Sequence, residues 1–314
     1  MAHSVTVAVV GGTEVAVQLG KKGTASDVTL FNNVHDGHTT TLVEPTQFPE
    51  KMAPLVNALS MADQCLLVLP ELNRVVAETI ATVEVSDVPT TIVVGPAVGP
   101  AEVARLLKGG RLETAPRCPL DFPLLRAQLE AWTAPEVAGT VRVPLDHASP
   151  VKGVGAVALG VVRQGTLHAH ERLRLWPSPK VVEVRSIQVH DEDRKDAGCG
   201  ERVGVALKGI EADELSRGQV LAPEGALLEG IRLRTGPLSK SRYYRGNDSP
   251  GAHLHLAIGL QVVPVFVEEQ GPEGGVLVPD RPVAFSANDR ALLIDLSVPS
   301  GPRIVGQQAV LGVG

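Results

Sequence analysis

The stretch PLDHASPVKGVGAVALGVVRQGTLHAHERLRLWPS occupies residues 144–178, and VEVRSIQVHDEDRKDAGCGERVGVALKGIEADELSRGQVL follows at residues 182–221. Over residues 154–161 valine and leucine alternate with alanine and glycine. A two-residue period is typical of a β-strand with two different faces. The alternation ends at the turn 163–165 and resumes at Leu167, which predicts a second strand after a tight turn.

Three more short strands are predicted in the same stretch, at residues 173–176, 181–189 and 203–208. Each one is followed by proline, glycine or an acidic turn. Short strands with turn signals at this spacing favour a closed barrel over an open sheet.

Several phrases of this stretch also match a known family: Asp146, KGVG at 152–155, the hairpin at 160–165, RSIQVH at 185–190, GERVG at 200–204 and RGQVL at 217–221. With them the stretch resembles the translational GTPases, in the barrel that follows their G domain. Within that family it is most similar to elongation factor Tu and to the archaeal selenocysteine-specific elongation factor. The resemblance runs over about eighty residues in one order, and it implies a protein of the translation apparatus.

Composition limits the fold before any motif is considered. The chain has 314 residues, 44% of them hydrophobic but only 3% aromatic, so its cores must be built from valine, leucine, alanine and isoleucine. This length allows two or three domains. No run of about 18 apolar residues suggests a membrane span. The N-terminus lacks a charged region with a cleavage site, so we expect a cytoplasmic protein and no membrane partner.

Charge differs between regions of the chain. Residues 137–245 hold 17 Lys and Arg against 13 Asp and Glu, whereas the whole chain has a net charge of −6. A basic middle between acidic ends does not favour general DNA binding, but a local basic face could meet an RNA backbone. An ordinary solvated surface is the competing interpretation.

Residues 1–136 alternate predicted strands with predicted helices. The strands lie at 4–10, 27–31, 40–43, 65–69 and 90–94, and the helices at 13–19, 49–61, 71–83, 100–108 and 122–132. This order predicts a parallel sheet with helices on both faces, the layout of a G domain. The fold class is therefore α/β plus β: a degenerate G-domain-like sheet in 1–136, then β-barrels in 137–229 and 230–314. In the last segment alternation returns at 253–267, 276–286, 291–298 and 303–311. The phrases LQVVP at 260–264 and RIVG at 303–306 resemble the third domain of the same factors, which implies the second barrel.

The signatures of a nucleotide site are missing from residues 1–136. After the first strand the chain reads Gly11-Gly12-Thr13-Glu14, with no Lys-Ser or Lys-Thr and with an acid where phosphate would sit. We interpret the later Gly20–Thr24, GKKGT, as a helix C-cap and a basic turn. The metal-holding Asp-x-x-Gly is replaced by Val43-Glu44-Pro45-Thr46, and the guanine-reading Asn-Lys-x-Asp by Gly95-Pro96-Ala97-Val98.

Phosphoryl transfer depends on positioning and charge neutralisation, so losing these groups together removes most of the machinery. We therefore expect a pseudo-GTPase that is not an enzyme, with no catalytic residues, no nucleotide, no metal and no other cofactor. A working GTPase with an atypical site is the alternative.

In the translational GTPases the first barrel holds the 3′ end and aminoacyl group of a charged tRNA. The resemblance implies a pocket-lining role for Asp146, a position beside the acceptor end for Arg163, and basic contacts near the terminal nucleotide for Lys208 and Arg217. For each of these residues, a surface charge tied into a turn is the competing interpretation.

A second candidate for RNA contact is the segment after residue 235, which reads GPLSKSRYYRG. Lys240, Arg242 and Arg245 offer phosphate contacts, and Tyr243 and Tyr244 offer stacking faces, a combination typical of single-strand binders. A flexible loop between two barrel strands is the other interpretation.

We therefore expect binding of tRNA or another RNA, with translation factors or the ribosome as further partners. A protein-interaction or regulatory module that has lost RNA binding is an alternative from a different class. Selenocysteine factors carry an additional C-terminal domain that senses an RNA signal, and since this sequence ends at Gly314 we do not expect a full factor of that kind.

Overall fold

The computed structural model describes residues 3–314, which form two compact units. The first unit contains the residues up to Thr133 together with the segments Leu238–Asn247 and Leu292–Gln307. The second contains Ala134–Pro237, Asp248–Ala291 and Gln308–Gly314. The domain limits at 137 and 230 stay a prediction.

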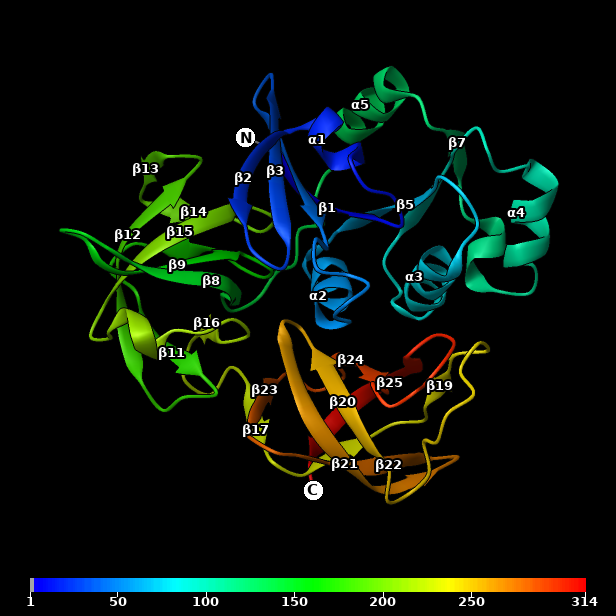
Figure 1. Cartoon of the computed structure of the whole chain (residues 1–314). Coiled ribbons are helices and arrows are strands. Elements are labelled where there is room, and N and C mark those ends of the chain that lie inside the picture. The colour runs from blue at the N-terminus through cyan, green and yellow to red at the C-terminus, as the bar shows by residue number, and fades with distance from the viewer. Residues whose placement is uncertain (1–2) are drawn as a thin grey trace. The chain divides into compact units, whose positions relative to one another are not determined.

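The first unit contains a seven-stranded sheet in the order β2-β3-β4-β1-β5-β6-β7 (Figure 1). Its strands are β1 His3–Val10, β2 Lys21–Ala25, β3 Thr29–His35, β4 His38–Glu44, β5 Gln64–Leu69, β6 Thr90–Val94 and β7 Arg117–Pro119. Strands β4, β1, β5, β6 and β7 are parallel, as predicted, but β2, β3 and β4 pair antiparallel. The fold class is confirmed, and the sheet is mixed rather than parallel throughout.

A tight turn explains the antiparallel edge. Asp36 and Gly37 connect β3 to β4, and both have positive φ, 47° and 78°. An Asp-Gly pair with positive φ at both positions is typical of a two-residue hairpin, which can only join antiparallel neighbours.

Helices cover both faces of this sheet (Figure 1). They are α1 Val15–Leu19, α2 Ala53–Met61, α3 Arg74–Val85, α4 Pro100–Leu107 and α5 Phe122–Ala131, with a short 3-10 helix η1 at Arg111–Thr114. Side chains of α1 and α5 share one core cluster with Val5, Val7 and Val9 of β1. The side chains of Asn73 and Asp121 cap α3 and α5 by accepting from the backbone N–H of Val76 and Leu124, both at 2.9 Å.

The basic segment after Gly20 is a strand and not the turn that the sequence predicts. Residues Lys21–Ala25 form β2 at the sheet edge, where Lys21 pairs with Asn32 and Lys22 with Phe31. Hydrogen bonds from β3 therefore override the local turn preference of two glycines. Lysines on an edge strand also discourage pairing with another chain.

The second unit contains a closed barrel in the order β11-β16-β8-β9-β15-β12, completed by β11–β12 pairing and extended by β13. Its strands are β8 Val143–Val151, β9 Gly155–Val161, β11 Arg172–Trp176, β12 Val181–Val189, β13 Glu192–Arg194, β15 Arg202–Lys208 and β16 Val220–Ala222. Strands β10 Leu167–His168 and β14 Asp196–Ala197 form a separate ribbon, and η2 is Ala212–Glu214. The barrel predicted from the deciding stretch is confirmed.

The alternation in β9 has the small residues inside. Ala156 and Ala158 belong to the barrel core, whereas Val157 and Leu159 are only half-buried on the outer face. Gly160 lies on the same face by alternation, and a Cβ there would come within 2.4 Å of the Pro144 carbonyl oxygen. Little room is left beside β8, and larger side chains would not fit.

The remaining sheet has the order β18-β22-β21-β20-β24-β25-β19 and is closed by β18–β25 pairing. Its strands are β18 Leu233–Thr235, β19 Ser239–Lys240, β20 His253–Ile258, β21 Gln261–Gly271, β22 Gly274–Pro279, β24 Arg290–Ile294 and β25 Ile304–Val313. Strands β17 Leu228–Gly230 and β23 Val283–Phe285 pair separately. The predicted run 253–267 is a hairpin instead of one strand, because Gly259 takes a positive φ of 54° between β20 and β21.

None of the helices in the described residues 3–314 has both the length and the apolar character needed to cross a membrane.

Candidate functional site

The loop after β1 begins with two glycines, Gly11 and Gly12, that lie close to β5. Gly11 has a φ of +90°, and a Cβ on it would lie 2.4 Å from the Val68 carbonyl oxygen. A Cβ on Gly12 would lie 2.8 Å from the Val68 side chain. The glycines thus allow the loop to pack closely against the end of β5. Thr13 and Glu14 follow these glycines. Glu14 has a φ of 67° and directly precedes the five-residue helix α1.

Two carboxylates, Glu14 and Glu44, follow or end the strands β1 and β4. Burial raises the pKa of Glu44, the last residue of β4, and the negative charge of Glu14 raises it further, while Lys22 acts in the opposite direction. Within the described chain, Glu44 Oε2 is buried and has no hydrogen-bond partner. The local field therefore disfavours an additional anion here.

The loop after β6 is held by its own backbone. The Gly95 N–H donates to the Leu69 carbonyl at 2.9 Å, and the Val98 N–H donates to the Gly95 carbonyl at 3.2 Å. The Val98 side chain is buried. Gly95, Pro96, Ala97 and Val98 offer no side-chain donor or carboxylate with which to read a base.

On the first barrel, Asp146 organises arginines and is not open to a ligand. Its side chain is 5% exposed and takes two bonds from Arg202, each 2.8 Å long. Its backbone carbonyl accepts from Arg217 Nε at 3.0 Å. The sequence alone does not predict that Arg202 pairs with Asp146. The two residues come together only because β8 and β15 both pair with β9 in this register.

The other two candidates on this barrel lie in different surroundings. Arg163 is half-buried after β9, where its N–H donates to the Arg142 carbonyl at 2.9 Å and its carbonyl accepts from Cys199 Sγ at 3.2 Å. Lys208 is exposed at the end of β15, with its Nζ 3.5 Å from Glu183 Oε2. Only Lys208 therefore presents an open charge with a weak, solvated partner.

In the segment Leu238–Asn247, Arg242 and Tyr243 contact the end of α4. Arg242 donates to the carbonyls of Leu107 and Lys108, and Tyr243 OH donates to the Leu106 carbonyl at 3.4 Å. The Arg242 guanidinium also lies over the Tyr243 ring, 4.7 Å from its centroid. A cation at a helix C-terminus satisfies carbonyls that have no partner within the helix. These contacts hold the segment in place.

Tyr244 lies in the core, so the stacking role predicted for it does not hold in this structure. The side chain is 2% exposed and its OH donates to Asp295 Oδ2 at 2.6 Å. Of the same segment, Lys240 and Arg245 are exposed. Arg245 Nη1 donates to the carbonyls of Arg242 and Tyr244, at 2.7 and 2.9 Å.

The chain is similar to known proteins in three ways. A family model described as elongation factor Tu domain 2 matches residues 155–222. An uncharacterised protein, MJ0325, of Methanocaldococcus jannaschii is 32% identical over 315 residues, covering 99% of each chain. The selenocysteine-specific elongation factor of the same organism is 33% identical over 132 residues, which are 42% of this chain and 28% of that factor.

Among solved structures, translation elongation factor SelB from Methanococcus maripaludis, in complex with the GTP analogue GppNHp, superimposes with a TM-score of 0.82. It shares 19% sequence identity and the match covers 99% of this chain and 79% of that one. Elongation factor 1-alpha of Picrophilus torridus is 25% identical over 176 residues, which are 54% of this chain and 42% of that factor.

Proposed function

Because the chain belongs to the translational GTPase family, we propose that it is an elongation-factor-like protein that neither binds nor hydrolyses GTP and that binds tRNA or another RNA. Its further partners would be the ribosome or other translation factors. We also propose that it works in the cytoplasm.

One observation carries the loss of nucleotide: Glu14 puts a negative charge where the family binds phosphate, and no lysine follows Gly12. The raised pKa of Glu44, which is due to burial and then to the negative charge of Glu14, supports this, because a phosphate would add further negative charge nearby. Without a lysine and a metal-holding aspartate, little remains to stabilise the transferring phosphoryl group.

RNA binding is supported by a different set of residues. Lys208, Lys240 and Arg245 are exposed and positively charged, and they come from the basic middle of the sequence. Arg163 and Arg217 are half-buried. We include them in the proposal with the roles that the family resemblance implies: Arg163 beside the acceptor end of a tRNA and Arg217 near its terminal nucleotide. Tyr243, also half-buried, would need its contacts with α4 to open before a base could stack on it.

Calorimetry tests both parts of the proposal. We expect no heat of binding when GTP with magnesium is added to the protein, and saturable binding when mixed, uncharged tRNA is added. Saturable GTP binding would favour the alternative of a GTPase with an atypical site. Absence of tRNA binding would favour a protein-interaction or regulatory module.

A further inference from the structure

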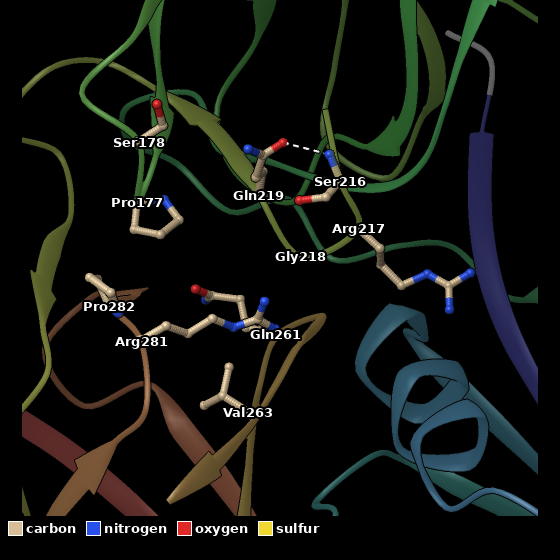
Figure 2. Close-up of a pocket in the computed structure, with 10 residues that line it drawn as sticks. All are labelled: Pro177, Ser178, Ser216, Arg217, Gly218, Gln219, Gln261, Val263, Arg281 and Pro282. Atoms are coloured by element: carbon tan, nitrogen blue, oxygen red, sulfur yellow. Dashed lines mark hydrogen bonds between the residues drawn. The ribbon is translucent and has the colours of Figure 1, made fainter. Parts of the chain in front are cut away.

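A cavity of about 320 Å³ opens in the second unit, where four connections meet (Figure 2). Its walls come from the β11–β12 connection, the turn before β16, the start of β21 and the β22–β23 connection. The lining residues include Ser178, Ser216, Gly218, Gln261, Val263 and Arg281. A volume of this size lies at the lower end of the range for small-molecule sites.

The walls of the cavity are fixed by close packing. Gly218 has a φ of +93°, and a Cβ on it would lie 2.9 Å from the Leu260 carbonyl oxygen. Gln261 is 8% exposed and uses both ends of its amide on Ala284, accepting from its N–H at 2.8 Å and donating to its carbonyl at 2.6 Å. The cavity is thus preformed and needs no ordering of a loop.

The second unit has two further stabilising features outside the lining of the cavity. Arg142 forms a two-pronged ion pair with Asp289, with N–O distances of 3.1 and 2.5 Å. Trp176 and Ala284, from different sheets, belong to one buried cluster. All of these residues belong to the second unit.

The chemistry of the cavity favours an anion. Two of its ten lining residues are arginines and, within the described chain, none of the ten is acidic. Arg217 stands at the rim with its guanidinium directed away from the centre (Figure 2), and its Nε donates to Asp146. Arg281 reaches toward Gln261 and donates to the Val262 carbonyl at 3.3 Å; no carboxylate in the described residues pairs with it. Arg281 therefore has donors to offer.

The hydroxyl group of Ser216 adds to these donors, since its side chain is exposed beside the turn. Ser178 Oγ points away from the centre of the cavity (Figure 2) and accepts from the Lys180 N–H at 3.2 Å. Pro177, Val263 and Pro282 give the same cavity an apolar wall. A guanidinium with a hydroxyl donor suits a phosphate, which has more acceptor oxygens than a carboxylate, and the apolar wall suits a base.

We propose that this cavity binds a single nucleotide by its phosphate, with Arg281 as the main contact. The nucleotide is either one residue of an RNA or a free nucleoside monophosphate, which share this chemistry. The RNA source rests on the proposed function, whereas the free nucleotide does not. The site is separate from the loop after β1, since its lining residues all belong to the second unit.

The test uses the full chain with three probes: adenosine 5′-monophosphate, adenosine and a short single-stranded RNA. Calorimetry measures affinity, and amide resonances of Gly218, Gln219 and the Gln261 side chain report where each probe binds. We expect adenosine 5′-monophosphate to shift these resonances in a saturable way and adenosine to bind much more weakly. Arg281→Ala should weaken monophosphate binding roughly tenfold or more, since a charge-assisted bond is lost.

Arg234→Ala is the matched control, because Arg234 is an exposed arginine of β18 that does not line the cavity. It should bind the monophosphate like the wild type, and both variants should keep the wild-type melting temperature. No saturable monophosphate binding, equal affinity in Arg281→Ala, or resonance shifts only elsewhere would overturn the proposal.

The outcomes also separate the cavity from RNA binding in general. If RNA binds equally well to Arg281→Ala, and neither RNA nor the monophosphate shifts the cavity resonances, the cavity proposal fails while the proposed function stands. If the monophosphate binds in the cavity but RNA does not bind, the proposed function fails and the free nucleotide is the ligand.

Discussion

At the residue scale, two adjacent tyrosines that were both predicted to contact RNA differ in their burial. Tyr244 is buried because its hydroxyl finds Asp295, whereas Tyr243 is only half-buried against α4. Burial opposes the ionisation of Asp295, but hydrogen bonds from Ser297 and Tyr244 outweigh it and hold the pKa of Asp295 below its ordinary value. The carboxylate is therefore the favoured form in the folded protein.

Tyr244→Phe should lower the free energy of unfolding by about 2 kcal/mol at neutral pH, the size of a hydrogen bond to a charged group. A carboxyl group with a lowered folded-state pKa stabilises the fold above its unfolded pKa, about 3.9, and this stabilisation is lost as pH falls through the folded value. The difference between wild type and variant should thus shrink on acidification. Urea unfolding at neutral pH and at about pH 3 measures it, and an unchanged difference would contradict the role of Asp295.

At the element scale, helix α3 anchors the later segment Leu292–Gln307 within the first unit. Glu78, on the buried side of α3, accepts from the backbone N–H of Arg303 at 3.0 Å and from its guanidinium at two positions, each 2.8 Å away. The same guanidinium donates to the Pro49 carbonyl at 2.9 Å. The side-chain hydrogen bond to Glu78 raises the pKa of Arg303 further.

Glu78→Ala should lower the free energy of unfolding by about 3 kcal/mol, because it leaves the Arg303 guanidinium partly buried without its carboxylate. Glu50→Ala removes an exposed acid instead and should change stability by less than about 0.5 kcal/mol. Chemical denaturation compares the two variants. Adding Arg303→Met to Glu78→Ala should recover part of the loss, and equal effects of the two single glutamate variants would refute the anchoring role.

At the scale of the whole molecule, the proposed RNA binding depends on the distribution of charge. The chain carries a net charge of −6, yet its exposed candidate contacts Lys208, Lys240 and Arg245 all come from the basic middle of the sequence. An RNA bound through such contacts displaces condensed counterions, and its affinity therefore depends on salt.

The affinity for tRNA should fall at least tenfold between about 50 and 200 mM salt. Replacing Lys240 and Arg245 together by alanine should weaken binding and reduce the salt dependence, because two phosphate contacts are lost. The matched control replaces Lys51 and Arg105, two exposed cations of the first unit, and should leave binding unchanged. Filter binding over a salt series measures the affinity and its salt dependence for each variant. An affinity for RNA that does not change with salt concentration would contradict the proposal.

Much of the fold could be read from the sequence, because the signals are local. The strands of the first barrel, the strand–helix order of residues 1–136 and the lack of a lysine after Gly12 are properties of neighbouring residues. The Asp36-Gly37 hairpin was open to the same reasoning, since Asp-Gly is a strong turn signal. The edge strand β2 was not, because its pairing partner alone makes it a strand.

The sequence by itself determined that two barrels follow an α/β domain and that the nucleotide signatures are missing, since strand period and motif residues are set within a few positions. Only the tertiary structure decided that Ala156 and Ala158 face the barrel core, that Arg202 neutralises Asp146, and that Tyr244 is buried. Each of these depends on a partner far away in the chain, and burial and ion pairing are determined by what lies close in space.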